Sequence, residues 1–308
     1  MPTYLKSFWL VLLAGLLPAS GPSQAEPQVP VETRWHVLLL ASDNTPLHQR
    51  VLSALESQLR GSDAITARAV ADTPEATRLV AAFDCSGCLI VTSGVAALQT
   101  TLDTTVDAEL LSIAIPKERF EQIGASRGDP PRLSAIYMDV SLADMLQVVD
   151  LRLHGVETVG IITADGNHLE RERLRGDLPA GTSRFREYRA GGESELVAVF
   201  EQAARETDAI LALPHPQIYN RDTIVRIMLT TYRIGTPLIG YSEGLNRAGA
   251  LMSVFATPEM LGEDAGRVIA TAVGEGEWRP LRRHTVRYNV VINRQVAHSM
   301  RIRFKDGS

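Results

Sequence analysis

Residues 213–262 read LPHPQIYNRDTIVRIMLTTYRIGTPLIGYSEGLNRAGALMSVFATPEMLG. Short apolar runs in this stretch alternate with amphipathic helical patterns, and polar or proline-containing loops follow the runs. The order predicts a strand, a loop, a helix, a strand, a loop, a strand and a helix. Parallel sheets covered by helices are built from this alternation. The stretch therefore places the chain in the α/β class.

The same alternation extends over most of the chain. Apolar runs at 36–41, 88–92 and 110–115 predict buried strands, and a second series restarts with runs at 133–138 and 158–163. Helix starts with a capping residue are predicted at Thr45-Pro46, Thr73-Pro74, Ser141, Asn220 and Thr257-Pro258. A chain of 308 residues exceeds what one small core usually holds, so two α/β lobes are expected.

Four motifs in the quoted stretch resemble one protein family. They are Pro214 at a strand end, Tyr219-Asn220 at a helix start, the helix exit at 232–237 (Tyr-Arg-Ile-Gly-Thr-Pro), and Ser242-Glu243 leading to Gly249-Ala250-Leu251. Together they resemble the periplasmic substrate-binding proteins of ABC transporters with the type 1 fold. The resemblance is to the subgroup that includes tryptophan- and tyrosine-type binding proteins.

The resemblance implies two Rossmann-like lobes with parallel sheets, joined by a three-strand hinge. The first lobe is expected over residues 34–138 plus 242–282, and the second over 139–241 plus 283–308. In this division, residues 241–249 cross between the lobes and the strand at 251–255 belongs to the first lobe. A helix over 168–175 and a strand near 183–188 are expected within the second lobe.

The first 25 residues have the pattern of an export signal. Lys6 supplies a positive charge, residues 8–17 are apolar, and Ser23-Gln24-Ala25 has small residues at the positions that signal peptidase requires. Cleavage after Ala25 and a periplasmic location are therefore expected. The apolar run is too short to span a bilayer, so no direct membrane insertion is expected. The net charge of −5 argues against nucleic acid as a partner.

The two cysteines, Cys85 and Cys88, precede an apolar strand. A redox pair would need a helix N-terminus, which lowers the pKa of the attacking thiol. A closed zinc site would need further ligands, and none is spaced to supply them. In an oxidising compartment we expect a short disulfide loop.

Ligand-binding candidates follow from the loops at the carboxyl ends of the predicted strands, where ligands bind in α/β sheets. The first lobe supplies Ser42, Asp43, Thr92, Ser93, Gly94 and Pro116. The second lobe and the return loop supply Asp139, Ala164, Asp165, His215, Tyr219, Ser242, Glu243 and Phe255.

Each candidate has an alternative that needs no ligand. Ser93-Gly94 also suits a strand-to-helix turn, and Asp165 belongs to a turn dipeptide. Asp43 either faces a ligand amine or caps the next helix, and His215 either contacts the ligand or is hydrogen-bonded within its loop. Tyr219 either covers the cleft or packs on Met228. Glu243 either bridges the lobes or stays solvated.

Enzyme signatures such as Gly-x-Ser-x-Gly, Walker A and His-Glu-x-x-His do not occur in the sequence. Ser93 with His215 is the one nucleophile and base pairing worth testing. We therefore expect no enzyme activity, no cofactor and no metal. The expected function is binding of a small polar or amphipathic ligand by a monomer and its delivery to an ABC permease. The alternative is sensing, with the periplasmic domain of a histidine kinase as the partner.

The loop at 115–121, IPKERFE, differs from the one that many members of the family place beside the ligand. The aromatic amino-acid specificity of some relatives is therefore not carried over to this chain.

Overall fold

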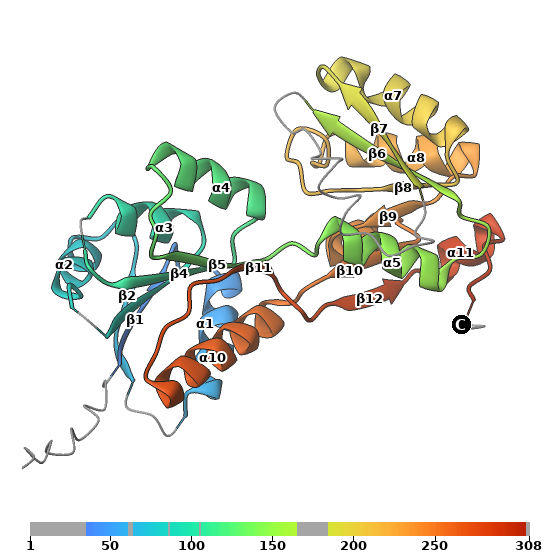
Figure 1. Ribbon diagram of the computed structural model, residues 1–308. Helices are drawn as coiled ribbons and strands as arrows, with labels where there is room; N and C mark the ends of the chain where they lie inside the picture. The colour runs from blue at the N-terminus through green and yellow to red at the C-terminus, as the bar shows by residue number, and fades with distance from the viewer. Residues whose placement is uncertain (1–34, 61–63, 86, 105, 165–183, 306–308) are drawn as a thin grey trace, which may run out of the picture. The chain divides into compact units, whose positions relative to one another are not determined.

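The computed structural model describes residues 35–60, 64–85, 87–104, 106–164 and 184–305 (Figure 1). The expected leader at 1–25, Asp165 and the helix expected at 168–175 lie outside the described residues. The described chain forms two six-stranded sheets with helices on both faces, which confirms the two-lobed α/β fold. None of the described helices combines the length and the apolar character needed to cross a bilayer.

The first sheet has the strand order β11-β5-β4-β3-β1-β2, and every neighbouring pair is parallel. Its strands are β1 (His36–Ala41), β2 (Ile65–Val70), β3 (Cys88–Ser93), β4 (Glu109–Ile113), β5 (Leu133–Tyr137) and β11 (Arg282–His284). Its helices are α1 (Pro46–Gln58), α2 (Pro74–Ala82), α3 (Val95–Leu102), α4 (Lys117–Ser126) and α10 (Pro258–Glu275).

The second sheet has the order β12-β10-β9-β8-β6-β7, in which only the edge strand β12 is antiparallel to its neighbour. Its strands are β6 (Thr158–Ala164), β7 (Arg184–Ala190), β8 (Ala209–Leu211), β9 (Leu238–Gly240), β10 (Met252–Phe255) and β12 (Asn289–Ile292). Its helices are α5 (Leu142–Arg152), α7 (Glu193–Glu206), α8 (Ile224–Ile234), α9 (Glu243–Ala248) and α11 (Arg294–Met300).

The apolar run in β1 follows from burial on both faces of the sheet. Val37 and Leu39 face one core with α1 and α10, whereas Leu38 and Leu40 face the other core with α2, α3 and α4. Successive strand residues point to opposite faces, so a strand covered by helices on both sides is apolar throughout. This is why β1 could be predicted from composition alone.

Three of the predicted helix caps form hydrogen bonds. The side chains of Thr73, Ser141 and Thr257 accept from the backbone N–H three residues later. Thr45 occupies the N-cap position of α1, but its side chain makes no cap bond. The predicted Asn220 cap lies one turn early, because α8 begins after Thr223.

The prediction for the strand at 251–255 was wrong. This strand, β10, pairs with β9 and β12 in the second sheet rather than with the first sheet. The segment expected to cross between the lobes instead forms α9, a helix of six residues that returns the chain beside β9. Leu251 N donates to Leu238 O at 2.9 Å, which fixes this return. The chain crosses to α10 only after Phe255.

Candidate functional site

The first sheet has a topological switch point between β1 and β3. From β1 the chain runs outward to β2, and then returns to the other side of β1 to form β3. Ligands of open α/β sheets bind at such a point, outside the carboxyl ends of the strands. Ala41 and Ser93 are paired in register at these two ends. The structure therefore brings together Ser42, Asp43, Thr92, Ser93 and Gly94, as the sequence predicted for strand ends.

The second sheet has the same kind of switch point between β6 and β8. Ala164 ends β6, and the loop after β8 carries His215 and leads to Tyr219. Ala164 is buried. Candidate residues thus lie at the switch point of each sheet.

Ser42 forms hydrogen bonds to Ser93 and to Ala97 across the first switch point. Ser42 N donates to Ser93 O at 2.9 Å, and Ser42 Oγ accepts from Ala97 N at 3.0 Å. Ser42 therefore satisfies one of the free N–H groups in the first turn of α3. It makes this bond from the position just after β1, so it links the end of β1 to the helix that follows β3.

His48 is a member of this cluster that the sequence did not predict. Its Nδ1 lies 2.8 Å from Ser93 Oγ, and both side chains are buried. Its Nε2 lies 3.8 Å from Asp43 Oδ1. Burial lowers the pKa of His48, and the Asp43 carboxylate opposes that shift. Since the Asp43 carboxylate favours the tautomer with its proton on Nε2, Nδ1 of the neutral ring accepts a hydrogen bond from the Ser93 hydroxyl.

The signal for His48 was its place in the first turn of a helix. Side chains on α-helices point back toward the N-terminus, so a residue in the first turn of α1 reaches the strand ends beside it. What the sequence did not contain was the identity of the partner, Ser93, which is 45 residues away.

Gly94 makes this arrangement sterically possible. Its φ is +92°, a value that favours glycine. A Cβ at this position would lie 2.5 Å from His48 Cε1 and 2.6 Å from Ser42 Oγ. The turn residue is therefore required both by the backbone and by the packing of the histidine.

Asp43 caps the start of α1, which was the role expected for it if it did not face a ligand amine. Its Oδ1 accepts from Thr45 N at 2.8 Å, and its side chain is 55% exposed. Hydrogen bonds from Thr45 lower the pKa of Asp43. The carboxylate is consequently charged and accessible, so capping leaves it free to meet a ligand cation.

Two hydroxyls next to the cluster have no hydrogen-bond partner among the described residues. They are Thr92 Oγ1 on β3 and Ser112 Oγ on the neighbouring strand β4, and both residues are buried. Their positions are adjacent, because Thr92 is in register with Ser112. Unpaired buried polar atoms carry a desolvation cost that a bound water or ligand atom would offset.

Pro116 and Asp139 lie at the carboxyl ends of β4 and β5. Pro116 occupies the N-cap position of α4, and Asp139 Oδ1 accepts from Lys117 N at 2.8 Å. The His284 ring lies 3.3 Å from Asp139 Oδ2 and 2.8 Å from Asp139 O. Burial raises the pKa of Asp139, and His284 and the Lys117 N–H oppose this shift. Asp139 thus connects two of the three segments that join the sheets.

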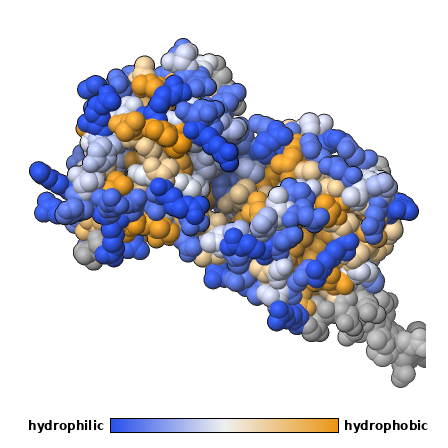
Figure 2. Space-filling model, turned by 180° about the vertical axis from the view of Figure 1, so that it is seen from behind, coloured by the Kyte–Doolittle hydropathy of each residue, from blue (hydrophilic) through white to orange (hydrophobic). Residues whose placement is uncertain are grey.

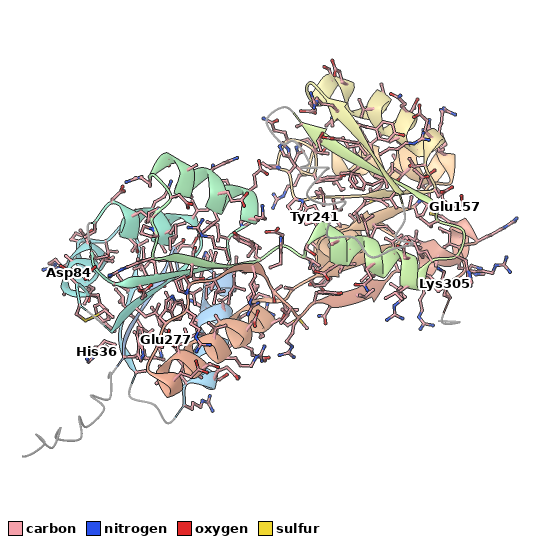
Figure 3. All side chains as sticks on the ribbon, in the orientation of Figure 1. His36, Asp84, Glu157, Tyr241, Glu277 and Lys305 are labelled. Atoms are coloured by element: carbon pink, nitrogen blue, oxygen red, sulfur yellow. A yellow bond between two sulfur atoms is a disulfide. The ribbon has the colours of Figure 1, made fainter. Side chains whose placement is uncertain are left out.

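His215 and Tyr219 belong to one loop of the second lobe, in which Tyr219 is buried and His215 half-buried. The His215 carbonyl accepts from Ile218 N and Tyr219 N, which folds the loop into a turn. Tyr219 packs edge-on against Phe200 and against Tyr241, which is labelled in Figure 3. His215 Nδ1 and Tyr219 Oη are buried and lack a hydrogen-bond partner among the described residues. Burial raises the pKa of Tyr219 far above its ordinary value.

Comparison with solved structures places this geometry in a known fold. The ligand-free, open structure of CD0873, a substrate-binding protein with adhesive properties from Clostridium difficile, matches with a TM-score of 0.65 and 14% identity over 86% of this chain and 94% of that one. An ABC domain from Streptococcus pneumonia in complex with L-Trp matches at 0.52, with 14% identity over 86% and 95%. The fold is that of the type 1 periplasmic binding proteins.

A third binding-protein structure, a periplasmic ribose ABC transporter protein from Conexibacter woesei, matches with a TM-score of 0.50 and 13% identity over 87% of this chain and 95% of that one. No protein-family profile and no curated protein matches the sequence. At identities this low, the structural likeness establishes the fold alone.

In this type 1 fold, the remaining candidates lie around the return loop of the second lobe. Ser242 Oγ accepts from Leu245 N at 3.2 Å and so caps α9. Glu243 is exposed and pairs with Arg247 at 3.4 Å, which agrees with its solvated alternative. Phe255 ends β10 in register with Asn289 of the second sheet.

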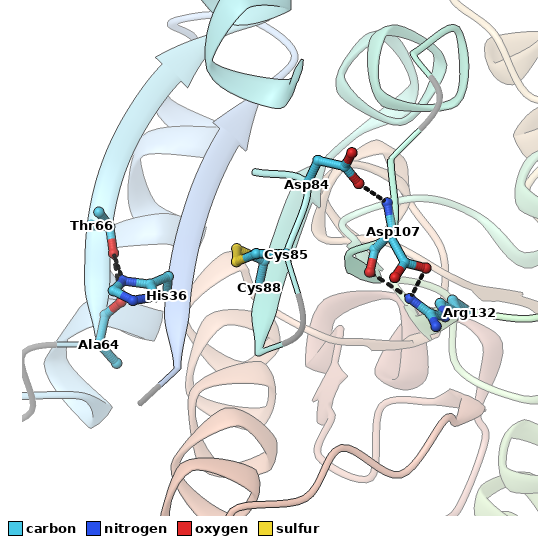
Figure 4. Close-up of a disulfide and its surroundings, with 8 residues drawn as sticks. All are labelled: His36, Ala64, Thr66, Asp84, Cys85, Cys88, Asp107 and Arg132. Carbon is cyan, nitrogen blue, oxygen red and sulfur yellow. Dashed lines mark hydrogen bonds and ion pairs between the residues drawn. A yellow bond between two sulfur atoms is a disulfide. The ribbon is translucent and has the colours of Figure 1, made fainter. Parts of the chain in front are cut away.

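Cys85 and Cys88 form a disulfide with a Cα–Cα distance of 5.2 Å (Figure 4). Cys88 begins β3, whereas Ser93 ends it. A strand rises about 3.3 Å per residue, so the disulfide lies roughly 16 Å from the switch point. Nearby, Asp84 Oδ1 accepts from Asp107 N at 2.5 Å. The crosslink therefore lies at the amino ends of the strands, opposite the switch point.

The sequence suggested Ser93 with His215 as a nucleophile and base, but in the structure Ser93 contacts a different histidine. Ser93 is hydrogen-bonded to His48, and its side chain is fully buried. A catalytic serine must reach a substrate carbonyl from its hydrogen-bonded base. Ser93 has the base but not the access, so its hydroxyl has a structural role in this conformation.

Proposed function

We propose that this protein binds a small polar or amphipathic solute between its two lobes and delivers it to an ABC permease. One observation carries the proposal. Polar residues gather at the topological switch point of the first sheet, and the loop after β8 brings His215 and Tyr219 to that of the second, in a fold shared with substrate-binding proteins. Closing two such edges on a solute is the hinge motion by which binding proteins of this architecture act.

Several features of the second lobe support a ligand that carries hydrogen-bonding groups. His215 Nδ1 and Tyr219 Oη are buried without a partner among the described residues. A ligand group that satisfied them would remove a desolvation cost already present in the free protein. Tyr241 adds an aromatic surface beside Tyr219, suited to an apolar part of the same ligand.

In the first lobe, the charged Asp43 carboxylate suits a ligand amine. The N-terminal turn of α3 beside Gly94 and Ser93 suits an anionic group, because helix N-termini favour negative charge. A zwitterion such as an amino acid has both groups. The proposed contacts are Ser42, Asp43, Thr92, Ser93, Gly94, Pro116, Asp139, Ala164, Asp165, His215, Tyr219, Ser242, Glu243 and Phe255.

The division into lobes and the location are part of the proposal. With β10 placed in the second sheet, the first lobe comprises residues 35–138 plus 256–284, and the second comprises 139–255 plus 285–305. We propose that the chain is exported, with its leader cleaved after Ala25, because a binding protein must meet its solute outside the cytoplasmic membrane.

A thermal-shift screen tests solute binding. Amino acids, sugars, nucleosides and small carboxylates are added one at a time to the purified protein. A solute at about 100 times its Kd should stabilise the protein by about 2.7 kcal/mol, which shifts the melting temperature visibly. A protein that unfolds cooperatively but responds to no solute in a broad library would count against the proposal.

Two histidine variants then localise the site. His215→Ala should weaken binding of the solute identified, measured by calorimetry. His36→Ala is the matched control, because His36 begins β1 at the opposite edge of the first sheet, where its Nδ1 lies 3.3 Å from Thr66 Oγ1 (Figures 3 and 4). Equal affinities in both variants would remove His215 from the site.

Uptake measurements distinguish delivery from sensing. Cells that lack this protein should lose high-affinity uptake of the radiolabelled solute if it serves a permease. Unchanged uptake, together with loss of a transcriptional response to the solute, would identify a sensor that acts through a histidine kinase.

A further inference from the structure

Helix α8 presents an apolar stripe to solvent. Of the five large apolar side chains that are exposed in the described residues, three lie on this helix: Val225 (61% exposed), Leu229 (58%) and Tyr232 (52%). Their spacing of four and three residues places them on one face. In Figure 1, α8 is drawn behind the second sheet, and the opposite view in Figure 2 shows apolar atoms gathered on this side of the second lobe.

The stripe is additional to the face with which α8 joins the core. Ile227 is buried in the second lobe, with Ile224 and Met228 packed against the same core. The outer stripe therefore has no role in holding α8 on its sheet. It includes Tyr232 of the Tyr-Arg pair at the helix exit, which the proposed solute site does not use.

Asp222 lies beside the N-terminal end of the stripe and Arg233 beside its C-terminal end. Arg226, on the same flank, is paired with Glu193 at 2.5 Å, and Arg221 is exposed next to Asp222. Asp222 and Arg233 are both exposed, and neither has an ion-pair partner among the described residues.

Asp222 lies in the turn just before α8. This turn is closed by a bond from Ile224 N to Asn220 O at 3.1 Å, which has the four-residue spacing of a helix. Asp222 and Arg233 are eleven positions apart, about three turns, and thus lie on the same flank.

This arrangement is complementary to itself. When two helices pack antiparallel about a two-fold axis, the same flanks of both copies meet, and the N-terminal end of one lies beside the C-terminal end of the other. Asp222 of one copy would then meet Arg233 of its partner, and Val225 would meet Tyr232. Along the sequence, the midpoint of each pair lies within one residue of Met228. A single two-fold axis beside Met228 therefore brings both pairs together.

We propose that α8 is a homodimer interface, with two copies of the chain packed antiparallel through Val225, Leu229 and Tyr232 and flanked by two Asp222–Arg233 ion pairs. The proposal departs from the monomer expected by resemblance, and does not depend on whether the protein binds a solute. A stripe one helix wide buries less than the about 800 Å² per partner of a standard interface. The dimer should therefore be reversible and concentration-dependent.

Sedimentation velocity of the full chain over a concentration series tests the proposal. The wild type should shift from monomer to dimer, and Leu229→Glu should weaken the dimer at least tenfold. Leu151→Glu is the matched control, since Leu151 is 62% exposed on α5, outside the stripe, and its replacement should leave the dimer unchanged. Circular dichroism checks that both variants are folded.

Charge reversal supplies the second test. Asp222→Arg and Arg233→Asp should each weaken the dimer, because each brings like charges together across the axis. The double variant D222R/R233D should restore it, because the pairs re-form with their signs exchanged. A wild type that stays monomeric at the highest concentration reached, a dimer insensitive to Leu229→Glu, or a double variant no better than the single ones would overturn the proposal.

Discussion

His48 Nδ1 lies 2.8 Å from Ser93 Oγ, and this contact joins the first turn of α1 to the last residue of β3. It fixes the two elements on either side of the first switch point relative to each other. Because the ring is buried and its pKa is lowered, the neutral form is the one that fits the folded protein.

Protonation of His48 should therefore oppose folding. A histidine whose pKa is lower in the folded state contributes stability above its unfolded pKa of about 6.5, and that contribution is lost as the pH falls toward the folded value. Denaturant unfolding at pH 7.5 and below 6.5 should show this loss in the wild type. His48→Asn keeps a polar group near Ser93 and should flatten the dependence.

The control for this measurement is His298→Asn. His298 is exposed on α11, so its replacement should leave the pH dependence of the wild type in place. A dependence that survives in His48→Asn and disappears in His298→Asn would assign the effect to the wrong histidine and refute the interpretation.

Gly94→Ala should lower the free energy of unfolding by about 2 kcal/mol or more. The variant combines a strained positive φ with a Cβ only 2.5 Å from His48 Cε1. Gly192→Ala is the matched control, because Gly192 also occupies the N-cap position of a helix but has open space around its Cβ position. It should cost about 1 kcal/mol or less. Similar losses in the two variants would argue against a steric role for Gly94.

Gly262→Ala should destabilise the first lobe through the packing of α10 on α1. A Cβ on Gly262 would lie 2.8 Å from Ala54 Cβ and 2.9 Å from Leu55 N, so the two helices must separate. We expect a loss of about 3 kcal/mol. Gly274→Ala in the same helix has open space and should stabilise by about 0.5–1 kcal/mol, since alanine is the better helix former. Thermal unfolding of both variants measures the contrast.

Arg283→Met should destabilise the protein because Asp264 is buried. The Asp264 side chain is 4% exposed, and Arg283 donates to both of its oxygens, at 2.7 and 3.0 Å. Removing the partner leaves a buried carboxylate with only Arg267 nearby, at 3.7 Å. The expected loss in urea unfolding is about 3 kcal/mol.

The comparison for this pair is Arg279→Met. Arg279 is 72% exposed and contacts Glu275 and Glu277 at 3.5 and 3.4 Å. Exposed ion pairs contribute little, so stability should change by about 0.5 kcal/mol or less. If Arg283→Met were equally mild, the burial of Asp264 would not be the source of its energetic importance.

Much of the fold could be predicted because burial and local hydrogen bonding leave marks on the sequence. β1 is apolar at successive positions because it faces two cores, and Thr73, Ser141 and Thr257 precede helices because their oxygens cap them. These features depend on neighbours in the chain.

Features that depend on distant partners could not be predicted in the same way. The four residues of β10 suit either sheet by composition, and only their pairing with β9 and β12 decides between the two. His48 resembles any histidine on a helix until Ser93 is placed beside it. Tyr241 likewise becomes part of the candidate site only through its contact with Tyr219.

The last strands of the chain, β11 and β12, each form an edge of a different sheet, and only four residues separate them. The first sheet is complete only when the chain has been supplied to residue 284, and the second only at residue 292. A chain delivered from its N-terminus must therefore leave an edge of each sheet unpaired until these two strands have been supplied. Truncation within this short region should damage two halves that share little other sequence.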